Sequence, residues 1–161
     1  MKARKRTSAG LLMYRFRNGR LEVFLAHPGG PFFHRKDNGH WTIPKGETEP
    51  GEELLGTAIR EFREEVGISA SGPYLELGWI QQKGGKIVHA WAFEGDREDD
   101  APHTCNTYKM EWPPSSGSFQ DYPEVDRVGF FAMREARQKL KAAQCEFLDR
   151  LEEHLRLAKI K

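Results

Sequence analysis

Alternating hydrophobic and polar positions divide the start of the chain into strands and loops. Residues 8–16 and 21–26 have the pattern of two strands, and Asn18-Gly19 between them is typical of a tight hairpin turn. We therefore expect these two strands to pair. The Gly/Pro run 28–31 predicts a loop. A short apolar piece, 41–43, stops at Pro44.

After the break at Pro50-Gly51, the apolar positions recur at the spacing of a helix instead of alternating. They predict one core-facing stripe: Leu55, Ala58, Ile59, Phe62 and Val66. Gly67 follows directly and is the residue type that commonly caps the end of a helix. The pattern predicts a helix that runs to about Val66.

The remaining pattern mixes strands and helices. Two strands, 74–82 and 86–94, are joined by a Gly-rich turn, and a last strand covers 128–132. Helices are expected at 134–141 and 145–157. Residues 95–123 are charged and then rich in Thr, Asn, Pro and Ser, which predicts a long loop of the kind that is often functional. This order predicts a layered α/β or α+β domain.

Length and composition narrow the class of protein. The 161 residues predict one domain, 1–161, with a basic tail at 1–7. Lys plus Arg is 25 and Asp plus Glu is 24, a net charge of +1 that argues against a protein that coats nucleic acid. No apolar run approaches the roughly 18 residues of a membrane span. Cys105 and Cys145 form no C-x-x-C pair, so a cytoplasmic location is the default expectation.

The near-neutral total hides a concentration of carboxylates. Glu61, Glu64 and Glu65 stand at i, i+3 and i+4, so they share one helix face beside the apolar stripe. Like charges so close raise one another's pKa, and a divalent cation reverses the repulsion. Carboxylate oxygens are the hard ligands that Mg²⁺ prefers. The alternative interpretation is a solvated acidic helix face.

A larger motif surrounds these glutamates. Residues 46–68, GETEPGEELLGTAIREFREEVGI, fit the Nudix box G-x5-E-x7-R-E-U-x-E-E-x-G-U without a departure. The fixed positions are Gly46, Glu52, Arg60, Glu61, Glu64, Glu65 and Gly67. The chain thus resembles the Nudix hydrolase family, and the strand order around the box extends the resemblance over most of the chain. The resemblance implies an α/β fold, an α/β/α sandwich around a mixed β-sheet.

The resemblance also implies roles for the box residues. Glu61, Glu64 and Glu65 would hold the metal, Mg²⁺ or in its place Mn²⁺, with the carbonyl of Lys45 as a further ligand. Glu52 and Arg60 would pair and brace the loop against the helix, with Gly46 and Gly67 as the glycines of the box. The family hydrolyses a nucleoside diphosphate linked to another group.

The implied chemistry needs a general base. A metal neutralises the pyrophosphate and lowers the pKa of a bound water, a carboxylate removes its proton, and the water attacks phosphorus in line. Family members use either the box glutamate that matches Glu61 or a glutamate on a late loop. The candidate for the latter is Glu124, because the segment that it opens, EVDRVGFF, resembles one in diadenosine tetraphosphate hydrolases. Asp121 and Asp126 compete with it. The predicted catalytic residues are Glu61, Glu64 and Glu124.

Basic and aromatic residues supply candidate substrate contacts. Residues 40–47, HWTIPKGE, resemble the W-x-x-P-K-G stretch of diadenosine and diphosphoinositol polyphosphate hydrolases and of bacterial predicted NTP pyrophosphohydrolases. Lys45 would meet phosphate as a point charge, and the preceding loop adds His34, Arg35 and Lys36. Aromatic side chains for stacking on a base are Trp41, Tyr108, Trp112 and Tyr122. A solvated loop is the alternative for the basic cluster.

The sequence therefore predicts a Mg²⁺-dependent hydrolase of a small nucleoside polyphosphate, either a diadenosine polyphosphate or an NTP-like compound. Nucleotide sugars and the 5′ end of capped RNA are alternative substrates, the latter being the one nucleic acid expected. A non-catalytic Nudix-fold regulator that binds nucleotides is a different class, but such modules usually lose box glutamates, and this chain keeps all of them. A structural protein with an acidic helix is a third. No membrane partner is expected, and the sequence leaves the oligomeric state open.

Overall fold

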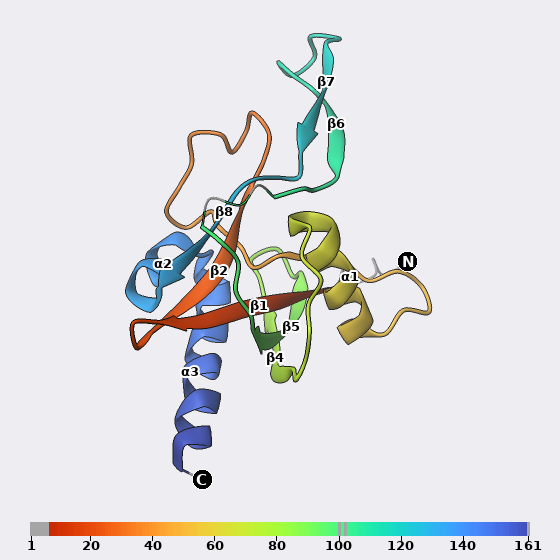
Figure 1. Ribbon diagram of the computed structural model, residues 1–161. Coiled ribbons are helices and arrows are strands. Elements are labelled where there is room, and N and C mark those ends of the chain that lie inside the picture. The colour runs from red at the N-terminus through yellow and green to blue at the C-terminus, as the bar shows by residue number, and fades with distance from the viewer. Residues whose placement is uncertain (1–6, 100, 102, 161) are drawn as a thin grey trace.

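A mixed six-stranded sheet forms the centre of the molecule (Figure 1). The computed structural model describes residues 7–99, 101 and 103–160. The strand order is β4-β5-β1-β2-β8, with β3 paired to β1. β1 and β5 run parallel, whereas the other pairs of this sheet are antiparallel. The strands are β1 (Thr7–Arg17), β2 (Arg20–Pro28), β3 (Lys45–Glu47), β4 (Leu75–Gln81), β5 (Ile87–Glu94) and β8 (Val125–Ala132).

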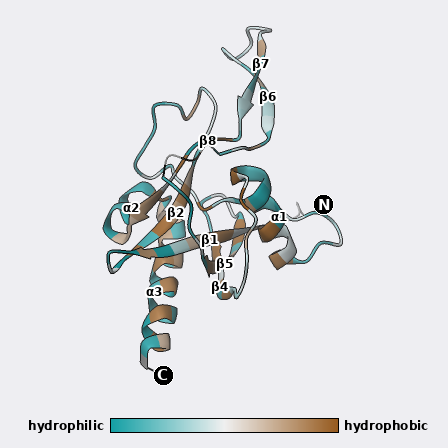
Figure 2. Ribbon diagram, viewed as in Figure 1, coloured by the Kyte–Doolittle hydropathy of each residue, from teal (hydrophilic) through white to brown (hydrophobic). Residues whose placement is uncertain are grey.

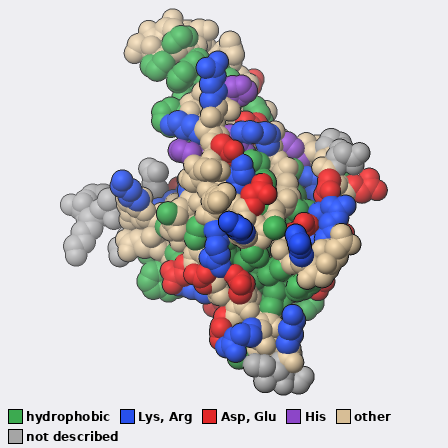
Figure 3. Space-filling model, turned by 90° about the vertical axis from the view of Figure 1, so that its left-hand side faces the viewer, with side chains coloured by type: hydrophobic (Ala, Val, Ile, Leu, Met, Phe, Trp, Pro, Cys, Tyr) green, Lys and Arg blue, Asp and Glu red, His purple; other side chains and the backbone are tan. Residues whose placement is uncertain are grey.

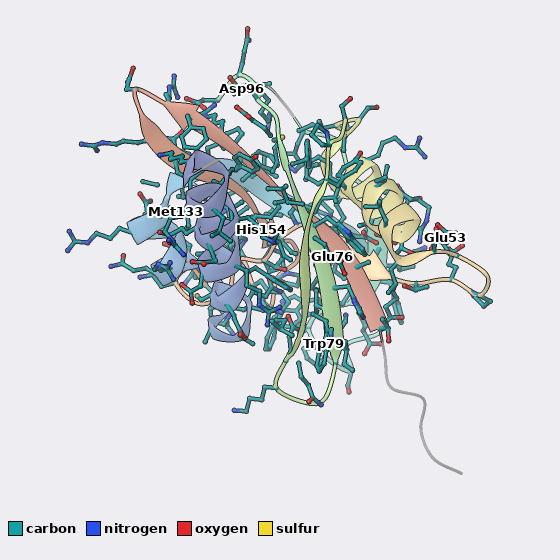
Figure 4. All side chains as sticks on the ribbon, turned by 90° about the horizontal axis from the view of Figure 1, so that it is seen from below. Glu53, Glu76, Trp79, Asp96, Met133 and His154 are labelled. Atoms are coloured by element: carbon teal, nitrogen blue, oxygen red, sulfur yellow. The ribbon has the colours of Figure 1, made fainter. Side chains whose placement is uncertain are left out.

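Helices cover both faces of this sheet. One face packs against α1 (Leu54–Val66), whose Ala58, Phe62 and Val66 form a core with residues of β1, β2 and β5. The other face packs against α2 (Met133–Lys139), the 3₁₀ turn η1 (Ala142–Gln144) and α3 (Cys145–Ile160). Figure 4 shows α1 and α3 on opposite sides of the strands. This arrangement confirms the expected α/β class with a mixed sheet.

The central strand β1 is buried on both faces. Leu11 and Met13 belong to the core under α1, while Leu12 and Tyr14 belong to the core under α3. Successive side chains of a strand point to opposite faces, so a strand covered on both sides is apolar at consecutive positions. Figure 2 shows hydrophobic colouring along strands of this sheet and also on parts of α1 and α3.

The edge strand β4 is covered by side chains from α3. Arg150 donates to the carbonyl oxygens of Leu77 and Trp79 at 2.8 and 2.9 Å, and Nε2 of His154 lies 2.8 Å from the carbonyl oxygen of Glu76. Figure 4 shows His154 on α3 and Glu76 on β4. These contacts satisfy backbone groups that an open edge would offer to another chain.

The prediction of an unbroken loop over 95–123 is wrong. This segment contains an antiparallel hairpin, β6 (Thr107–Glu111) and β7 (Phe119–Pro123), which forms a second, two-stranded sheet. The hairpin projects from the body of the molecule (Figure 1). Its strands are short and polar, and they bury too little apolar surface to leave a clear strand pattern in the sequence. The Pro-rich stretch that begins at Trp112 is the turn of this hairpin.

The other predicted elements occur with shifts of a few residues at their ends. β3 was missed because it has only 3 residues and follows a proline. The expected basic tail 1–7 lies outside the described residues except for Thr7, which opens β1. In the part of the chain that the structure describes, no helix has the length and hydrophobicity needed to cross a membrane.

Candidate active site

Arg60 ties the turn before α1 to the helix. Its Nε donates to Oε2 of Glu52 at 2.7 Å and its Nη2 to Oε1 of Glu52 at 3.0 Å. Oε1 of Glu52 also accepts from the Thr57 hydroxyl at 2.7 Å. The Arg60 guanidinium, helped by Thr57, lowers the pKa of Glu52 from 4.5 to about 2. The expected pair of Arg60 with Glu52 is therefore present.

The same guanidinium holds two more glutamates. Nη1 of Arg60 lies 2.9 Å from Oε1 of Glu61 and 3.1 Å from Oε2 of Glu64. Burial raises the pKa of Glu61 above its usual range, and the charges of Glu64 and Glu124 add to the rise. One arginine therefore keeps the acidic face of α1 in a fixed arrangement.

The structure explains why two positions of the box are occupied by glycine. A Cβ on Gly46 would clash with the carboxylate of Glu61, so only glycine lets β3 lie against that side chain. Gly67 has φ +74°, the left-handed conformation of a helix cap, and its N–H donates to the carbonyl oxygen of Arg63 at 2.8 Å. The predicted end of the helix at Gly67 is confirmed.

Glu65 reaches from α1 to the start of β3. The backbone N–H of Lys45 donates to its Oε2 at 3.1 Å. Burial raises the pKa of Glu65, and the nearby charges of Glu61 and Glu124 act in the same direction. Burial also lowers the pKa of the Lys45 ammonium, together with repulsion by Lys86. The site thus holds buried charges of both signs at close range.

Glu124 comes from the junction of β7 and β8. Its N–H donates to the carbonyl oxygen of Asn106 at 2.9 Å, and its carbonyl oxygen accepts from the N–H of Gly29 at 2.9 Å. Burial and the charge of Glu64 raise the pKa of its carboxyl above the usual range. The backbone therefore fixes Glu124 opposite the helix glutamates, and those contacts connect three separate segments of the chain.

Several of these residues line one cleft of about 410 Å³, whereas Glu52, Arg60 and Glu64 are not among the residues of its wall. Its acidic residues are Glu47, Glu61, Glu65 and Glu124, its basic residues are Lys45 and Lys86, and the rest of its wall is Pro28, Gly29, Phe33, Gly46 and Tyr108. As the side chains of the described residues stand, no three metal-binding groups converge closely enough to hold an ion. Nη1 of Arg60 occupies the space between Glu61 and Glu64.

The two competitors of Glu124 lie outside the cleft wall. Oδ1 of Asp126 lies 2.7 Å from Nδ1 of the fully buried His27, whose Nε2 lies 2.5 Å from the carbonyl oxygen of Lys36. Asp121 is exposed on β7 opposite Lys109. Neither carboxylate lines the cleft, which leaves Glu124 as the late-loop glutamate beside the box.

The structure separates the predicted substrate contacts into two groups. Lys45 and Tyr108 line the cleft. His34 and Arg35 are exposed on the loop that precedes residue 41, and Nζ of Lys36 lies 3.8 Å from the centre of the Phe32 ring. None of these three basic residues is among the residues of the cleft wall, and their loop contributes Phe33 instead. Trp112 and Tyr122 lie on the β6–β7 hairpin, outside the cleft wall.

The structure places Trp41, a predicted substrate contact, in the core and outside the cleft wall. Its side chain is only 5% exposed, and its indole N–H donates to Oδ1 of Asp37 at 2.8 Å. Its ring packs edge-on against Phe131 with centroids 4.9 Å apart. An aromatic residue beside a phosphate-binding motif offers the same sequence signal whether it faces the substrate or the core, so only the fold separates these two roles.

Two residues near the site were missed by the sequence reasoning. Lys86, from the turn before β5, lines the cleft beside Lys45. Gln144 is fully buried in η1, where its Oε1 accepts from the N–H of Ile43 at 2.9 Å and its Nε2 donates to Gln82 at 2.7 Å. It supports the segment that leads into β3. No local motif marks either residue, because both act through contacts between distant segments.

A family model described as NUDIX domain matches residues 4–151, and the chain belongs to this family. The bis(5′-nucleosyl)-tetraphosphatase (asymmetrical) of Caenorhabditis elegans is 40% identical over 126 residues, 73% of this chain and 87% of that protein. The mouse protein of the same name is 46% identical over 61 residues, 34% of this chain. The chain spans 42% of the length of this mouse relative.

Solved structures show the same fold. A crystal structure of a C. elegans Ap4A hydrolase binary complex has a TM-score of 0.65 at 24% identity and covers 93% of this chain and 97% of that one. The NUDIX domain of Shewanella oneidensis NrtR, complexed with ADP ribose, has a TM-score of 0.65 at 15% identity and covers 96% of this chain and 90% of that one. At these identities the likeness concerns the fold.

Proposed function

We propose that this chain is a Mg²⁺-dependent pyrophosphohydrolase that cleaves a nucleoside polyphosphate, preferably a diadenosine polyphosphate. The observation that carries the proposal is the cleft itself. It gathers Glu61, Glu65 and Glu124 with the cations Lys45 and Lys86. Carboxylates suit a divalent metal, and lysines suit a phosphate chain. The 40% identity to the C. elegans bis(5′-nucleosyl)-tetraphosphatase supports the preference for this substrate class.

The chemistry of the residues present fits a hard divalent cation, although the side chains of the described residues do not converge on one point as they stand. Burial raises the pKa values of Glu61, Glu65 and Glu124, and repulsion among the glutamates adds to each rise. A cation at this position would relieve that repulsion. Glu61, Glu64 and Glu65 would hold it, with the carbonyl oxygen of Lys45. When bound, Mg²⁺ neutralises phosphate oxygens and lowers the pKa of a coordinated water, and Mn²⁺ would do the same.

Glu124 is the proposed general base. Burial moves the pKa of its carboxyl toward neutral pH. A base whose pKa lies near the working pH can both accept and release a proton. It would take the proton of the water that attacks phosphorus, and the bond from that phosphorus to its bridging oxygen breaks. The leaving phosphate carries away the negative charge, which Lys45 and Lys86 would stabilise. The Arg60 guanidinium pairs with Glu61 and opposes the rise of its pKa, so Glu61 is the weaker candidate for the base.

A substrate screen tests this proposal. The protein is incubated with Mg²⁺ and, separately, diadenosine tetraphosphate, ATP, a nucleotide sugar or 5′-capped RNA, and the products are separated by chromatography. The proposal predicts ATP and AMP from diadenosine tetraphosphate. Binding of nucleotides without any phosphate-containing product, at every concentration of Mg²⁺ or Mn²⁺, would contradict it and favour a regulatory module.

A further inference from the structure

The β6–β7 hairpin has two distinct faces. Residues directly opposite in an antiparallel pair share a face, and faces alternate along each strand. Tyr108 opposes Tyr122 and Met110 opposes Gln120. We call this first face the inner face. The N–H of Trp112, one residue past β6, donates to the carbonyl oxygen of Ser118 at 2.9 Å, so the pairing and the alternation of faces continue to Trp112. The outer face carries Lys109 opposite Asp121 and Glu111 opposite Phe119.

The inner face is continuous with the catalytic cleft. Tyr108 belongs to both, since it lines the cleft and lies at the start of β6. Its hydroxyl donates to the carbonyl oxygen of Gly29 at 2.9 Å, and a Cβ on Gly30 would clash with that hydroxyl. The rings of Tyr108 and Tyr122 are 6.2 Å apart between centroids. The hairpin is thereby anchored at its base, with its aromatic face beginning at the cleft.

The part of the inner face nearest the hairpin turn carries apolar side chains that lie away from the interior of the molecule. Neither Met110 nor Trp112 belongs to the two hydrophobic cores of the described residues. Figure 3 shows hydrophobic side chains grouped on the projecting hairpin. A two-stranded hairpin that stands away from a core gains little stability from such residues. Aromatic side chains on it are suited to stacking against a flat ligand, because every nucleobase offers a π-face.

We propose that the inner face of the hairpin binds the aromatic bases of the substrate, with Tyr122 stacking on the base nearer the cleft and Trp112 on the more distant one. This inference rests on the proposed function and deepens it by naming what the substrate carries beyond its phosphates. Trp112 lies four positions beyond Tyr108, about 13 Å along a strand. A base at Trp112 therefore needs a long phosphate chain between itself and the cleft, so the hairpin favours dinucleoside polyphosphates over nucleoside triphosphates.

The outer face offers a matched control. Phe119 is 60% exposed and lies on the same hairpin, but on the face that does not continue into the cleft. Trp112→Ala and Phe119→Ala each remove an aromatic side chain near the hairpin turn. The inference predicts that only the first of these changes, together with Tyr122→Leu, weakens substrate binding.

The experiment compares KM and kcat for diadenosine tetraphosphate in these three variants, with Mg²⁺. Loss of one stacked base corresponds to a 5- to 150-fold rise in KM, roughly, for Trp112→Ala or Tyr122→Leu, with kcat within about threefold of wild type. Phe119→Ala should change KM by less than about twofold, and Trp112→Phe should restore most of the loss, because it keeps an aromatic ring. Inhibition by inorganic tripolyphosphate, which has no base, should be unchanged in every variant.

Three results would overturn the inference. One is an equal effect of Trp112→Ala and Phe119→Ala, another is a parallel loss of tripolyphosphate inhibition, and the third is a change in oligomeric state on gel filtration with no change in KM. Absence of turnover by the wild-type protein would instead contradict the proposed function. The variants would then be compared by their dissociation constants for diadenosine tetraphosphate, so that the two failures stay distinguishable.

Discussion

Arg60 and Glu52 face each other across the turn before α1, joined by two hydrogen bonds of 2.7 and 3.0 Å. The pair lies beside the acidic face and not within the cleft wall. Because the same guanidinium contacts Glu61 and Glu64, the turn, the helix and two glutamates form one connected unit. The pair therefore acts on the site through position, by fixing where those glutamates stand.

Glu52→Gln should lower the melting temperature at pH 7 by a few degrees. The pKa of Glu52 in the folded protein is lowered to about 2 from 4.5, chiefly by the Arg60 hydrogen bonds. Its ionised form therefore stabilises the fold above about pH 4.5, and this stabilisation is lost as the pH falls toward about 2. Thermal melting of both proteins between pH 7 and pH 2.5 should show the difference shrinking on acidification.

Glu53→Gln is the control for this change. Glu53 is adjacent and exposed, and its side chain makes no capping bond at the start of α1. Its melting curve should follow the wild type at every pH. A constant difference between Glu52→Gln and the wild type across the pH range would show that the ion pair is not the cause.

Gly46→Ala should inactivate the enzyme with little loss of fold. The added Cβ would clash with the carboxylate of Glu61 and displace it. A misplacement of about 1 Å can cost on the order of 100-fold in rate. Gly56→Ala serves as the control, because Gly56 lies in α1 with nothing near its missing Cβ, so alanine should stabilise that helix by about 0.5–1 kcal/mol. Equal kcat/KM in both variants would contradict this account.

Trp41→Ala should destabilise the protein and leave its substrate contacts intact. Removing a buried tryptophan costs about 3–5 kcal/mol of unfolding free energy, which urea denaturation would measure. KM for diadenosine tetraphosphate, determined well below the melting temperature, should stay within about twofold of wild type. A large rise in KM with unchanged stability would restore Trp41 as a substrate contact.

Gln144→Ala should also destabilise the protein, through lost hydrogen bonds. The N–H of Ile43 would lose its partner while buried. An unsatisfied buried donor costs about 1–3 kcal/mol. Gln138→Ala on α2 is the control, since Gln138 is exposed. Urea denaturation of both variants separates the predicted loss from a general effect of shortening glutamine, which would lower the two stabilities equally.

Much of the fold could be predicted because the signals for its elements lie in residues that are close together in the sequence. The stripe that includes Phe62 predicts α1, and the glycine at 67 predicts its end, which the left-handed φ of +74° confirms. The box places Glu61, Glu64 and Glu65 on one face by spacing alone. The pairing of Arg60 with Glu52 also follows from that motif.

The features that were missed depend on contacts between distant segments. Gln144 and Gln82 are 62 residues apart, yet their side chains bond directly. Trp41 is buried because Phe131 and Asp37 surround it, and nothing in its neighbouring sequence says so. The β6–β7 hairpin is stabilised by cross-strand pairing over a polar sequence, which gives no clear hydrophobic period.

The most direct test of the central claim is the Mg²⁺-dependent hydrolysis of diadenosine tetraphosphate by wild type, Glu64→Gln and Glu153→Gln. Glu153 lies on α3, where it pairs with Arg156 far along the chain from the box, and serves as the control. We expect ATP release by the wild type and Glu153→Gln that stops when EDTA removes the metal. The kcat/KM of Glu64→Gln should fall at least about 100-fold. Loss of a residue that only supports a metal ligand typically costs about 10- to 100-fold. Unchanged turnover by Glu64→Gln, or full activity in EDTA, would contradict the account.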